Sequence, residues 1–230
     1  SIGSFLGSNF VGVMGCAGAF GISLLVMLVA NIGSPSNSVK LLLAGMALSA
    51  VCSAFSSFVV FFAHDREGMM SITYWLMGSL AGANWGNIAV ILPLVILCVF
   101  FFITQYRVLN LMLLGDEVSI TLGTDLHKYR NFYLLVTSLM IGFIVYASGM
   151  IGFVGLIIPH VVRILVGTDH KKLIPISCLM GAILLVWADV LCRVMIKGTE
   201  LPIGILISMI GAPCFIYLMA KKSYGFGGKD

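Results

Sequence analysis

The chain has 230 residues, of which 60% are hydrophobic and 10% are charged, and its net charge is +4. A soluble domain is about half apolar and a quarter charged, so this apolar surplus exceeds what one soluble core can bury. The six cysteines lie in apolar runs without a CxxC pair, which argues against a disulfide framework or a metal site. The positive charge is modest and lies in loops, so it does not indicate nucleic-acid binding. Lipid is the expected solvent.

Seven apolar runs have about the length that crosses a bilayer as a helix. In chain order they cover residues 10–31, 41–63, 87–106, 132–149, 151–168, 173–196 and 201–220. The segment 69–82 is too short to span, and we expect an interfacial or re-entrant helix with Tyr74 and Trp75 at headgroup depth. The runs do not alternate apolar and polar residues, so a membrane barrel is not expected. The predicted fold is an all-α, polytopic transmembrane helix bundle that forms a single domain over residues 1–230.

The first span carries small residues at steps of three: Gly12, Gly15, Gly18 and Gly21. Small side chains let a neighbouring backbone come close, which is how helices associate in lipid without a hydrophobic driving force. This pattern predicts tight helix packing and needs no further function.

The basic residues predict the orientation. With the N-terminus outside, the cytoplasmic loops and tail hold nine of the thirteen lysines and arginines, namely Lys40, Arg107, Lys128, Arg130, Lys171, Lys172, Lys221, Lys222 and Lys229. The outer loops hold only Arg66 and Lys197. This positive-inside bias predicts a cytoplasmic C-terminus.

The longest cytoplasmic connection, 106–130, reads YRVLNLMLLGDEVSITLGTDLHKYR. Apolar residues at helical spacing, broken at Gly115 and Gly123, predict two short helices joined at a glycine. Asp116 and Glu117 begin the second helix, where negative charge suits the helix dipole. A loop this long in a compact membrane protein is usually functional, and the alternative is a plain surface connector. No Walker A pattern is present, so any ATP chemistry is expected on another chain.

Charged residues within the spans are costly and usually face protein or water. Asp189 and Arg193 are four residues apart, so they share a helix face and can form an ion pair. That pair is either structural or leaves Arg193 available to a partner at the outer mouth. Pro159 removes a backbone hydrogen bond and is expected to bend its helix. His160 is more typical of a hydrogen-bonded core residue than of a metal ligand, and no metal site is predicted.

The last span begins with TELPIG. Thr199 or Glu200 is expected to cap the helix, with Pro202 in its first turn. Gly211 and Pro213 are expected to interrupt the same helix and to give a kink.

Several long motifs together resemble one family. They are YASGMIGFVGLIIPHVVRILVGTDHKKLIP, GAILLVWADVLCRVM, TELPIGILISMIGAPCFIYLM, LNLMLLGDEVSITLG and YWLMGSLAGANW. They resemble the FecCD-type permeases, the membrane subunits of binding-protein-dependent ABC importers for iron-siderophores, haem, cobalamin and some oxyanions. The resemblance covers residues 40–220.

Members of this family have about ten spanning helices in each subunit. The resemblance therefore implies that the chain is the C-terminal part of such a subunit, with about seven of the spans. Met150 stands where the family commonly has proline, which implies that the backbone bend at this position is eased.

The resemblance also implies roles for individual residues. The segment that docks on the ATPase subunit corresponds to Leu114, Gly115, Asp116, Glu117, Leu122 and Gly123. Arg193 falls where the family places a basic residue that faces glutamates of the substrate-binding protein, and Arg66 is a weaker candidate by position alone. The transport pathway is expected between two permease subunits, lined partly by the 41–63 helix.

The implied function is alternating access without covalent chemistry in this chain. The expected partners are a second, identical permease subunit, two ATP-binding subunits that hold ATP and Mg²⁺, an extracytoplasmic substrate-binding protein and lipid, in the cytoplasmic (inner) membrane of a prokaryote. The chain itself is expected to need no cofactor. An iron-siderophore-like chelate is the first choice of substrate, with haem, cobalamin or molybdate as alternatives. Rival classes are an ion-coupled secondary transporter and a membrane scaffold.

Overall fold

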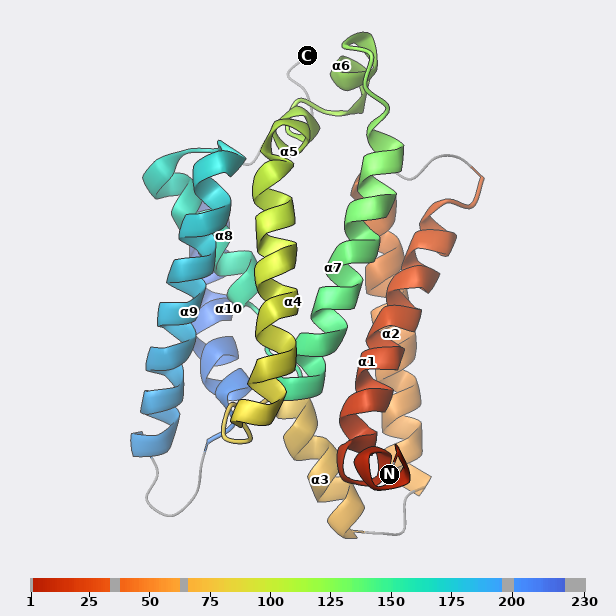
Figure 1. Ribbon diagram of the computed structural model, residues 1–230, viewed down its shortest axis with the longest axis vertical. Coiled ribbons are helices and arrows are strands. Elements are labelled where there is room, and N and C mark those ends of the chain that lie inside the picture. The colour runs from red at the N-terminus through yellow and green to blue at the C-terminus, as the bar shows by residue number, and fades with distance from the viewer. Residues whose placement is uncertain (1, 34–37, 63–65, 196–200, 222–230) are drawn as a thin grey trace.

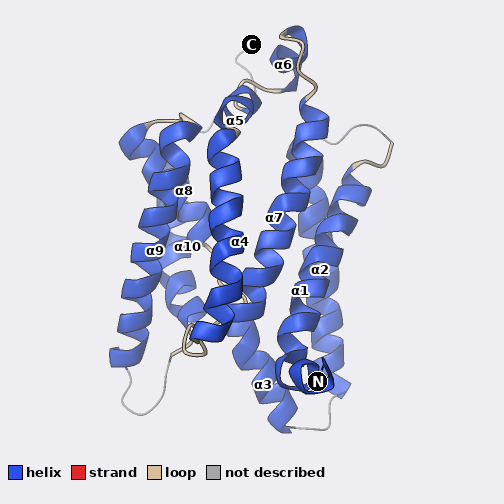
Figure 2. Ribbon diagram, in the orientation of Figure 1, coloured by secondary structure: helices blue, strands red, loops and turns tan. Residues whose placement is uncertain are grey.

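The computed structural model describes residues 2–33, 38–62, 66–195 and 201–221, and these residues form helices joined by short turns, without strands (Figure 2). The helices of this described part are α1 (Ile2–Ala30), α2 (Ser38–Phe62), α3 (Arg66–Met77), α4 (Trp85–Thr104), α5 (Tyr106–Met112), α6 (Asp116–Thr121), α7 (Leu126–Ser148), α8 (Val154–Val166), α9 (His170–Met195) and α10 (Ile203–Lys221). The predicted all-α bundle is confirmed.

Five of the expected spans are helices long and apolar enough to cross a membrane. Within the described residues they are Val13–Ala30, Val39–Phe62, Trp85–Thr104, Leu126–Ser148 and His170–Met195. Of the other two, α8 has 13 residues and is shorter than the expected 151–168 run, whereas α10 has 19 residues and nearly matches the expected 201–220 run. At 1.5 Å per residue α8 covers about 20 Å, against the ~30 Å of a hydrocarbon core.

Some helices begin earlier than the apolar runs. α7 starts at Leu126, six residues before the expected 132–149 run. Its cap is Asp125, whose Oδ1 accepts a hydrogen bond from the His127 backbone N–H at 3.1 Å. An apolar run marks only the part of a helix that suits hydrocarbon, so the polar first turns of α7 lie outside the 132–149 run.

α7 lies near the middle of the bundle and packs along α1 (Figure 1). On its other side α7 contacts α4, and α4 in turn contacts α9. α8, α9 and α10 pack together as a group beyond α4, while α2 packs on α1 at the opposite edge. Large side chains of α2 remain exposed along its length, including Leu42, Phe55, Phe58 and Phe61.

Two clusters of buried residues hold α8, α9 and α10 together. One core cluster joins Ala188 and Cys192 of α9 to Ile203, Leu206 and Ile207 of α10. A second joins α8 to α9 through Ile158, Val162 and Leu173. In lipid these contacts gain little from the hydrophobic effect, so close van der Waals fit is what holds the three helices.

The predicted short outer helix is present as α3, at the end of the bundle opposite α5 and α6 (Figure 1). Tyr74 is 56% exposed. Trp75 instead packs on α1, because a Cβ built on Gly15 would lie 2.6 Å from Cη2 of its indole ring. The headgroup depth of the two aromatic side chains stays a prediction, and Trp75 in addition makes a contact between helices.

Backbone segments approach one another closely where α3 ends. The Ser79 N–H donates to the Ser148 carbonyl at 2.9 Å. Gly149 has φ +66°, and a Cβ there would collide with the Trp75 carbonyl oxygen. A Cβ at Gly204 would collide with the carbonyl oxygen of Met77. Glycine is required at both positions because backbone, which cannot swing away, occupies the space of a side chain.

The proline-bearing helices are continuous in the structure. α8 runs through Pro159, and the Nδ1 of His160 lies 2.7 Å from the Leu156 carbonyl one turn earlier. α10 runs through Gly211 and Pro213 as one continuous helix, and the kink expected there stays a prediction. Gly211 also allows close packing, because a Cβ there would lie 2.7 Å from Ile157 Cδ1 of α8.

The start of α10 also differs from the expectation. Pro202 precedes the first helical residue, Ile203, and its carbonyl accepts the Ile205 N–H at 3.1 Å, so it occupies the cap position and not the first turn. The capping prediction for Thr199 and Glu200 lies outside the described residues.

We predict that Gly204→Ala destabilises the bundle by about 1–3 kcal/mol, the usual cost of overpacking against atoms that cannot move. The measurement is the midpoint of thermal unfolding in detergent. Gly18→Ala is the matched control, because nothing lies within 4 Å of a Cβ built on Gly18. Equal or higher midpoints for Gly204→Ala than for the control would show that α10 does not approach α3 this closely.

Candidate functional site

The turn between α4 and α7 contains two short helices, α5 and α6, as predicted. Gly115 joins them with φ +88°, a conformation that side chains other than glycine rarely adopt, and α6 begins at Asp116. The Ser119 side chain is fully buried between them. Its hydroxyl donates to the Gly115 carbonyl at 2.8 Å and lies 3.2 Å from the Leu111 carbonyl. The two helices therefore form one hydrogen-bonded unit.

α6 ends at a second glycine in the left-handed region. Gly123 has φ +78°, its N–H donates to the Ile120 carbonyl at 2.9 Å, and the Thr124 N–H donates to the Ser119 carbonyl at 3.0 Å. The bond from Thr124 back to Ser119 is that of a Schellman motif, in which glycine follows the last helical residues. Leu122 and Gly123 thus fix the point at which the chain leaves α6.

This turn presents an apolar surface at one end of the bundle, shown uppermost in Figure 1. Leu114, Val118, Ile120 and Leu122 are 56%, 46%, 67% and 60% exposed. The side chains of Asp116 and Glu117 lie outside the described residues. Apolar side chains exposed together beyond the ends of the long helices are typical of a protein contact surface.

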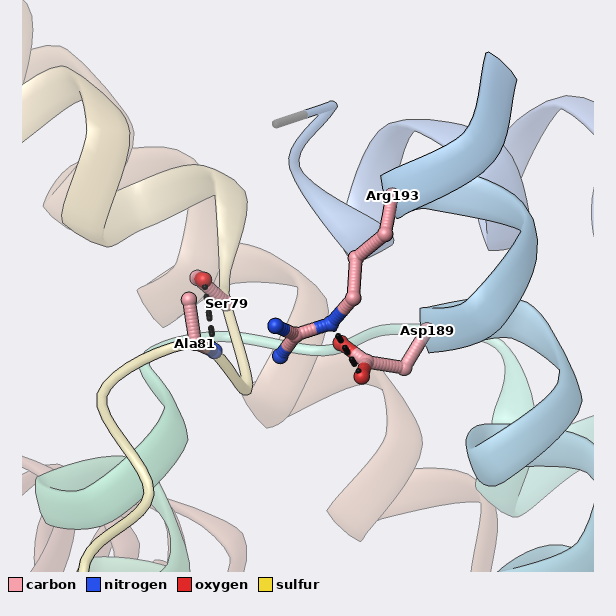
Figure 3. A network of polar contacts seen from close by, with 4 residues as sticks. All are labelled: Ser79, Ala81, Asp189 and Arg193. Carbon is pink, nitrogen blue, oxygen red and sulfur yellow. Dashed lines mark hydrogen bonds and ion pairs between the residues drawn. The ribbon is translucent and has the colours of Figure 1, made fainter. Parts of the chain in front are cut away.

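The opposite end of the bundle carries the Asp189–Arg193 pair of α9 (Figure 3). The Arg193 Nε donates to Asp189 Oδ2 at 2.8 Å, with 46% and 25% of the two side chains exposed. Figure 3 shows the guanidinium directed toward the turn that holds Ser79 and Ala81. Arg66 opens α3, and its side chain is outside the described residues. The expected ion pair is present, and the arginine keeps an exposed face.

A cavity of about 720 Å³ lies beside the end of α3. It is formed by the last residues of α3, by residues 150–152 and by the start of α10. Its lining contains Met77, Met150 and Met209 with other apolar side chains, and Ser208 is the polar side chain in the lining. A cavity with this lining offers a bound molecule flexible apolar contact and no charged anchor.

Three polar residues at the α5–α6 end of the bundle were not singled out from the sequence. The Asn110 amide of α5 donates to Asp169 Oδ1 at 2.9 Å, and its oxygen accepts the His170 N–H at 2.9 Å. This hydrogen bond from Asn110, followed by one from the Lys171 backbone, lowers the pKa of the Asp169 carboxyl. Ser119 is the third missed residue. The sequence did contain two signals. Asn110 is a polar residue within the apolar LNLMLL run, and Asp169 stands where a helix cap is expected.

Comparisons with known proteins agree with this arrangement. The hemin transport system permease protein HmuU of Yersinia pestis is 36% identical over 94% of this chain, and the vitamin B12 import system permease protein BtuC of Salmonella typhi is 36% identical over 93%. The chain spans 63% and 64% of the lengths of these two relatives.

A solved structure of a metal-chelate type ABC transporter in an inward-facing conformation matches with a TM-score of 0.80 and 31% identity, over 92% of this chain and 72% of that protein. The model of the FecCD transport family matches residues 1–221. Since that match runs through all the helices described above, the chain belongs to the FecCD transport family.

Proposed function

We propose that this chain is the permease subunit of a binding-protein-dependent ABC importer, which moves a metal chelate across the cytoplasmic membrane by alternating access. The observation that carries the proposal is the glycine-hinged α5–α6 turn with its exposed apolar surface, at the end of a family bundle that is rich in basic residues. A plain connector would gain nothing from exposing Leu114, Ile120 and Leu122 to water.

In this proposal the α5–α6 turn docks on a separate ATPase subunit. The apolar side chains of α6 supply contact area, and the bonds of Ser119 keep α5 and α6 at a fixed angle, so the pair moves as one body. ATP binding closes the ATPase subunits and displaces the turn. The chain performs no covalent chemistry and needs no cofactor of its own, because ATP and Mg²⁺ are held by the ATPase.

The proposed orientation places the α5–α6 turn and the C-terminus in the cytoplasm, and α3 with Arg193 outside. The clustering of lysine and arginine in alternate loops supports it. A second copy of the chain is the proposed partner at the α2 edge, where Phe55, Phe58 and Phe61 are exposed and α1 covers the other side. The pathway would lie between the two copies.

The proposed substrate is an iron-siderophore-like chelate. Haem or cobalamin is the second candidate, because HmuU and BtuC carry hemin and vitamin B12 in their names. The methionine-rich lining of the outer cavity favours a large chelate with apolar surface over molybdate. A small oxyanion is bound by charged or N–H donors, and this cavity contains no lysine, arginine or histidine in its lining.

The first test is uptake into liposomes that contain the chain with its cognate ATPase and binding protein. We expect ATP-dependent uptake of a ferric hydroxamate such as ferrichrome, with haem and cobalamin assayed in parallel. Uptake of haem or cobalamin alone would replace the siderophore assignment. Uptake that needs an ion gradient and no ATP would contradict the importer proposal as a whole.

We predict that Gly115→Val uncouples transport. Forcing a β-branched residue into φ +88° costs about 1–2 kcal/mol locally and turns α6 away from its docking angle. Uptake should fall about tenfold or more while the protein remains inserted, because 1.4 kcal/mol corresponds to a factor of ten. ATP hydrolysis and uptake are measured on the same liposomes.

Gly33→Val is the matched control for this substitution. Gly33 has φ +80° with open space around its Cβ position, and it follows α1 at the same end of the bundle. It should carry the same local strain without touching the turn. Equal uptake losses in the two variants would remove Gly115 from the coupling role.

We also predict that Arg193→Glu weakens docking of the binding protein by about tenfold at low ionic strength, through loss of a charge pair at the rim. The reversed pair Asp189→Arg with Arg193→Glu controls for the ion pair of α9, because it keeps an opposite-charge pair at the same spacing. Binding is measured by surface plasmon resonance at two salt concentrations. Unchanged affinity at low salt would exclude Arg193 from docking.

A further inference from the structure

The Asn110 side chain contacts two residues, Asp169 and His170, that lie 59 and 60 positions later in the chain. Its Nδ2 donates to Asp169 Oδ1 at 2.9 Å, and its Oδ1 accepts the His170 backbone N–H at 2.9 Å. The His170 Nδ1 lies 2.7 Å from the same oxygen. Both polar atoms of the amide are thus used, and these contacts reach from α5 to Asp169, before α9, and to His170, the first residue of α9.

The residue that receives the Asn110 amide is itself the cap of α9. Asp169 Oδ1 accepts the Lys171 N–H at 3.1 Å, and the Asp169 carbonyl accepts the N–H groups of Lys172 at 3.1 Å and Leu173 at 2.9 Å. Asn110 therefore holds the first turn of α9 and not a loose loop. The bond to the carboxylate is charge-assisted, which makes it stronger than a bond between neutral groups.

On its other side α5 is tied to α6 through the buried Ser119, whose hydroxyl contacts the carbonyls of Leu111 and Gly115. A continuous set of polar contacts therefore runs from α6 through the end of α5 to Asn110, and from there to Asp169. The sequence places these groups in three separate elements, and the fold brings them together at one end of the bundle.

α9 extends this connection across the bundle. It has 26 residues, so it is about 39 Å long, and it packs against α8, α10 and α4. Arg193 lies in its last turn, and Figure 1 shows the helix running between the two ends of the molecule. A displacement of its first turn cannot be absorbed within a packed helix and is passed to its neighbours.

We infer that Asn110 is a positioning residue that fastens the α5–α6 turn to α9, so that movement of the turn shifts the α8–α9–α10 group. The inference rests on the proposed importer function, because it takes the turn to be the part that an ATPase displaces. Without the tie, the turn can move while α9 stays in place, and ATP is hydrolysed without transport.

The main experiment exchanges donor and acceptor. Asn110→Asp places two carboxylates against each other, and we expect the ATP hydrolysed per transported chelate to rise about tenfold, the equivalent of one charge-assisted hydrogen bond. The double variant Asn110→Asp with Asp169→Asn restores a donor and an acceptor in reversed order, and should return the ratio toward wild type. Liposomes with the complete importer are assayed with ferrichrome, haem and cobalamin separately.

Asn131→Ala is the matched control for Asn110→Ala. Asn131 lies on α7, and its amide contacts His127 in the same helix at 3.2 Å, so its loss leaves the ties between elements intact. Asn110→Ala should raise the ratio of ATP to chelate, and Asn131→Ala should not. An unchanged ratio in Asn110→Ala, or a double variant as impaired as Asn110→Asp, would overturn the inference.

A second measurement is independent of transport. In the detergent-solubilised chain, Asn110→Ala should speed hydrogen exchange of the His170 amide by about tenfold, because its acceptor is lost. Exchange as fast in wild type as in the variant would show that the tie does not exist. The two measurements can also disagree. If the His170 amide exchanges slowly in the wild-type protein but the importer shows no ATP-dependent uptake, the hydrogen bond from Asn110 exists and the proposed function is wrong.

Discussion

The structure depends on how helices can hold together where water does not drive them. Burying leucine against leucine gains little in a solvent of acyl chains, so the bundle relies on close fit and on polar groups that find partners. The contacts of Gly149 and Gly204 with backbone carbonyls are the extreme case, because a side chain at Gly149 would push α3 away from the end of α7, and one at Gly204 would separate α3 from α10. For the same reason, the few hydrogen bonds and ion pairs between polar side chains have a large part in fixing how the helices are arranged.

Those polar ties lie at the two ends of the bundle. At one end Ser119 and Asn110 connect α6, α5 and α9, and at the other Arg193 pairs with Asp189. The middle of the bundle is largely apolar packing. This arrangement suits the proposed subunit, in which a change at one end of the bundle is transmitted by shifts of whole helices between a docking protein and an ATPase.

The sequence was sufficient to predict the helices, because runs such as 41–63 and 173–196 are long, apolar and bounded by charge. It also predicted the paired short helices, since Gly115 and Gly123 punctuate an otherwise helical pattern. It failed where an outcome depended on distant neighbours. Gly211 indicated a kink, and nothing near it in the sequence shows that Ile157 of α8 packs against it. The tie of Asn110 to Asp169 spans 59 residues, beyond the reach of any local pattern.

Because α8 begins only at Val154, the residues before it are not helical, and this limits their contact with lipid. Residues 149–153 leave the helical hydrogen-bonding pattern, and Phe153 has φ +63°. Peptide groups outside a helix cannot be left against hydrocarbon tails, because nothing there can bond to them. The end of α3 and the beginning of α10 approach the Met150 carbonyl, so they cover part of this stretch from the bilayer. Displacing α3 would therefore expose these peptide groups to lipid. This explains why the fold keeps α3, although that helix is too short to cross the membrane.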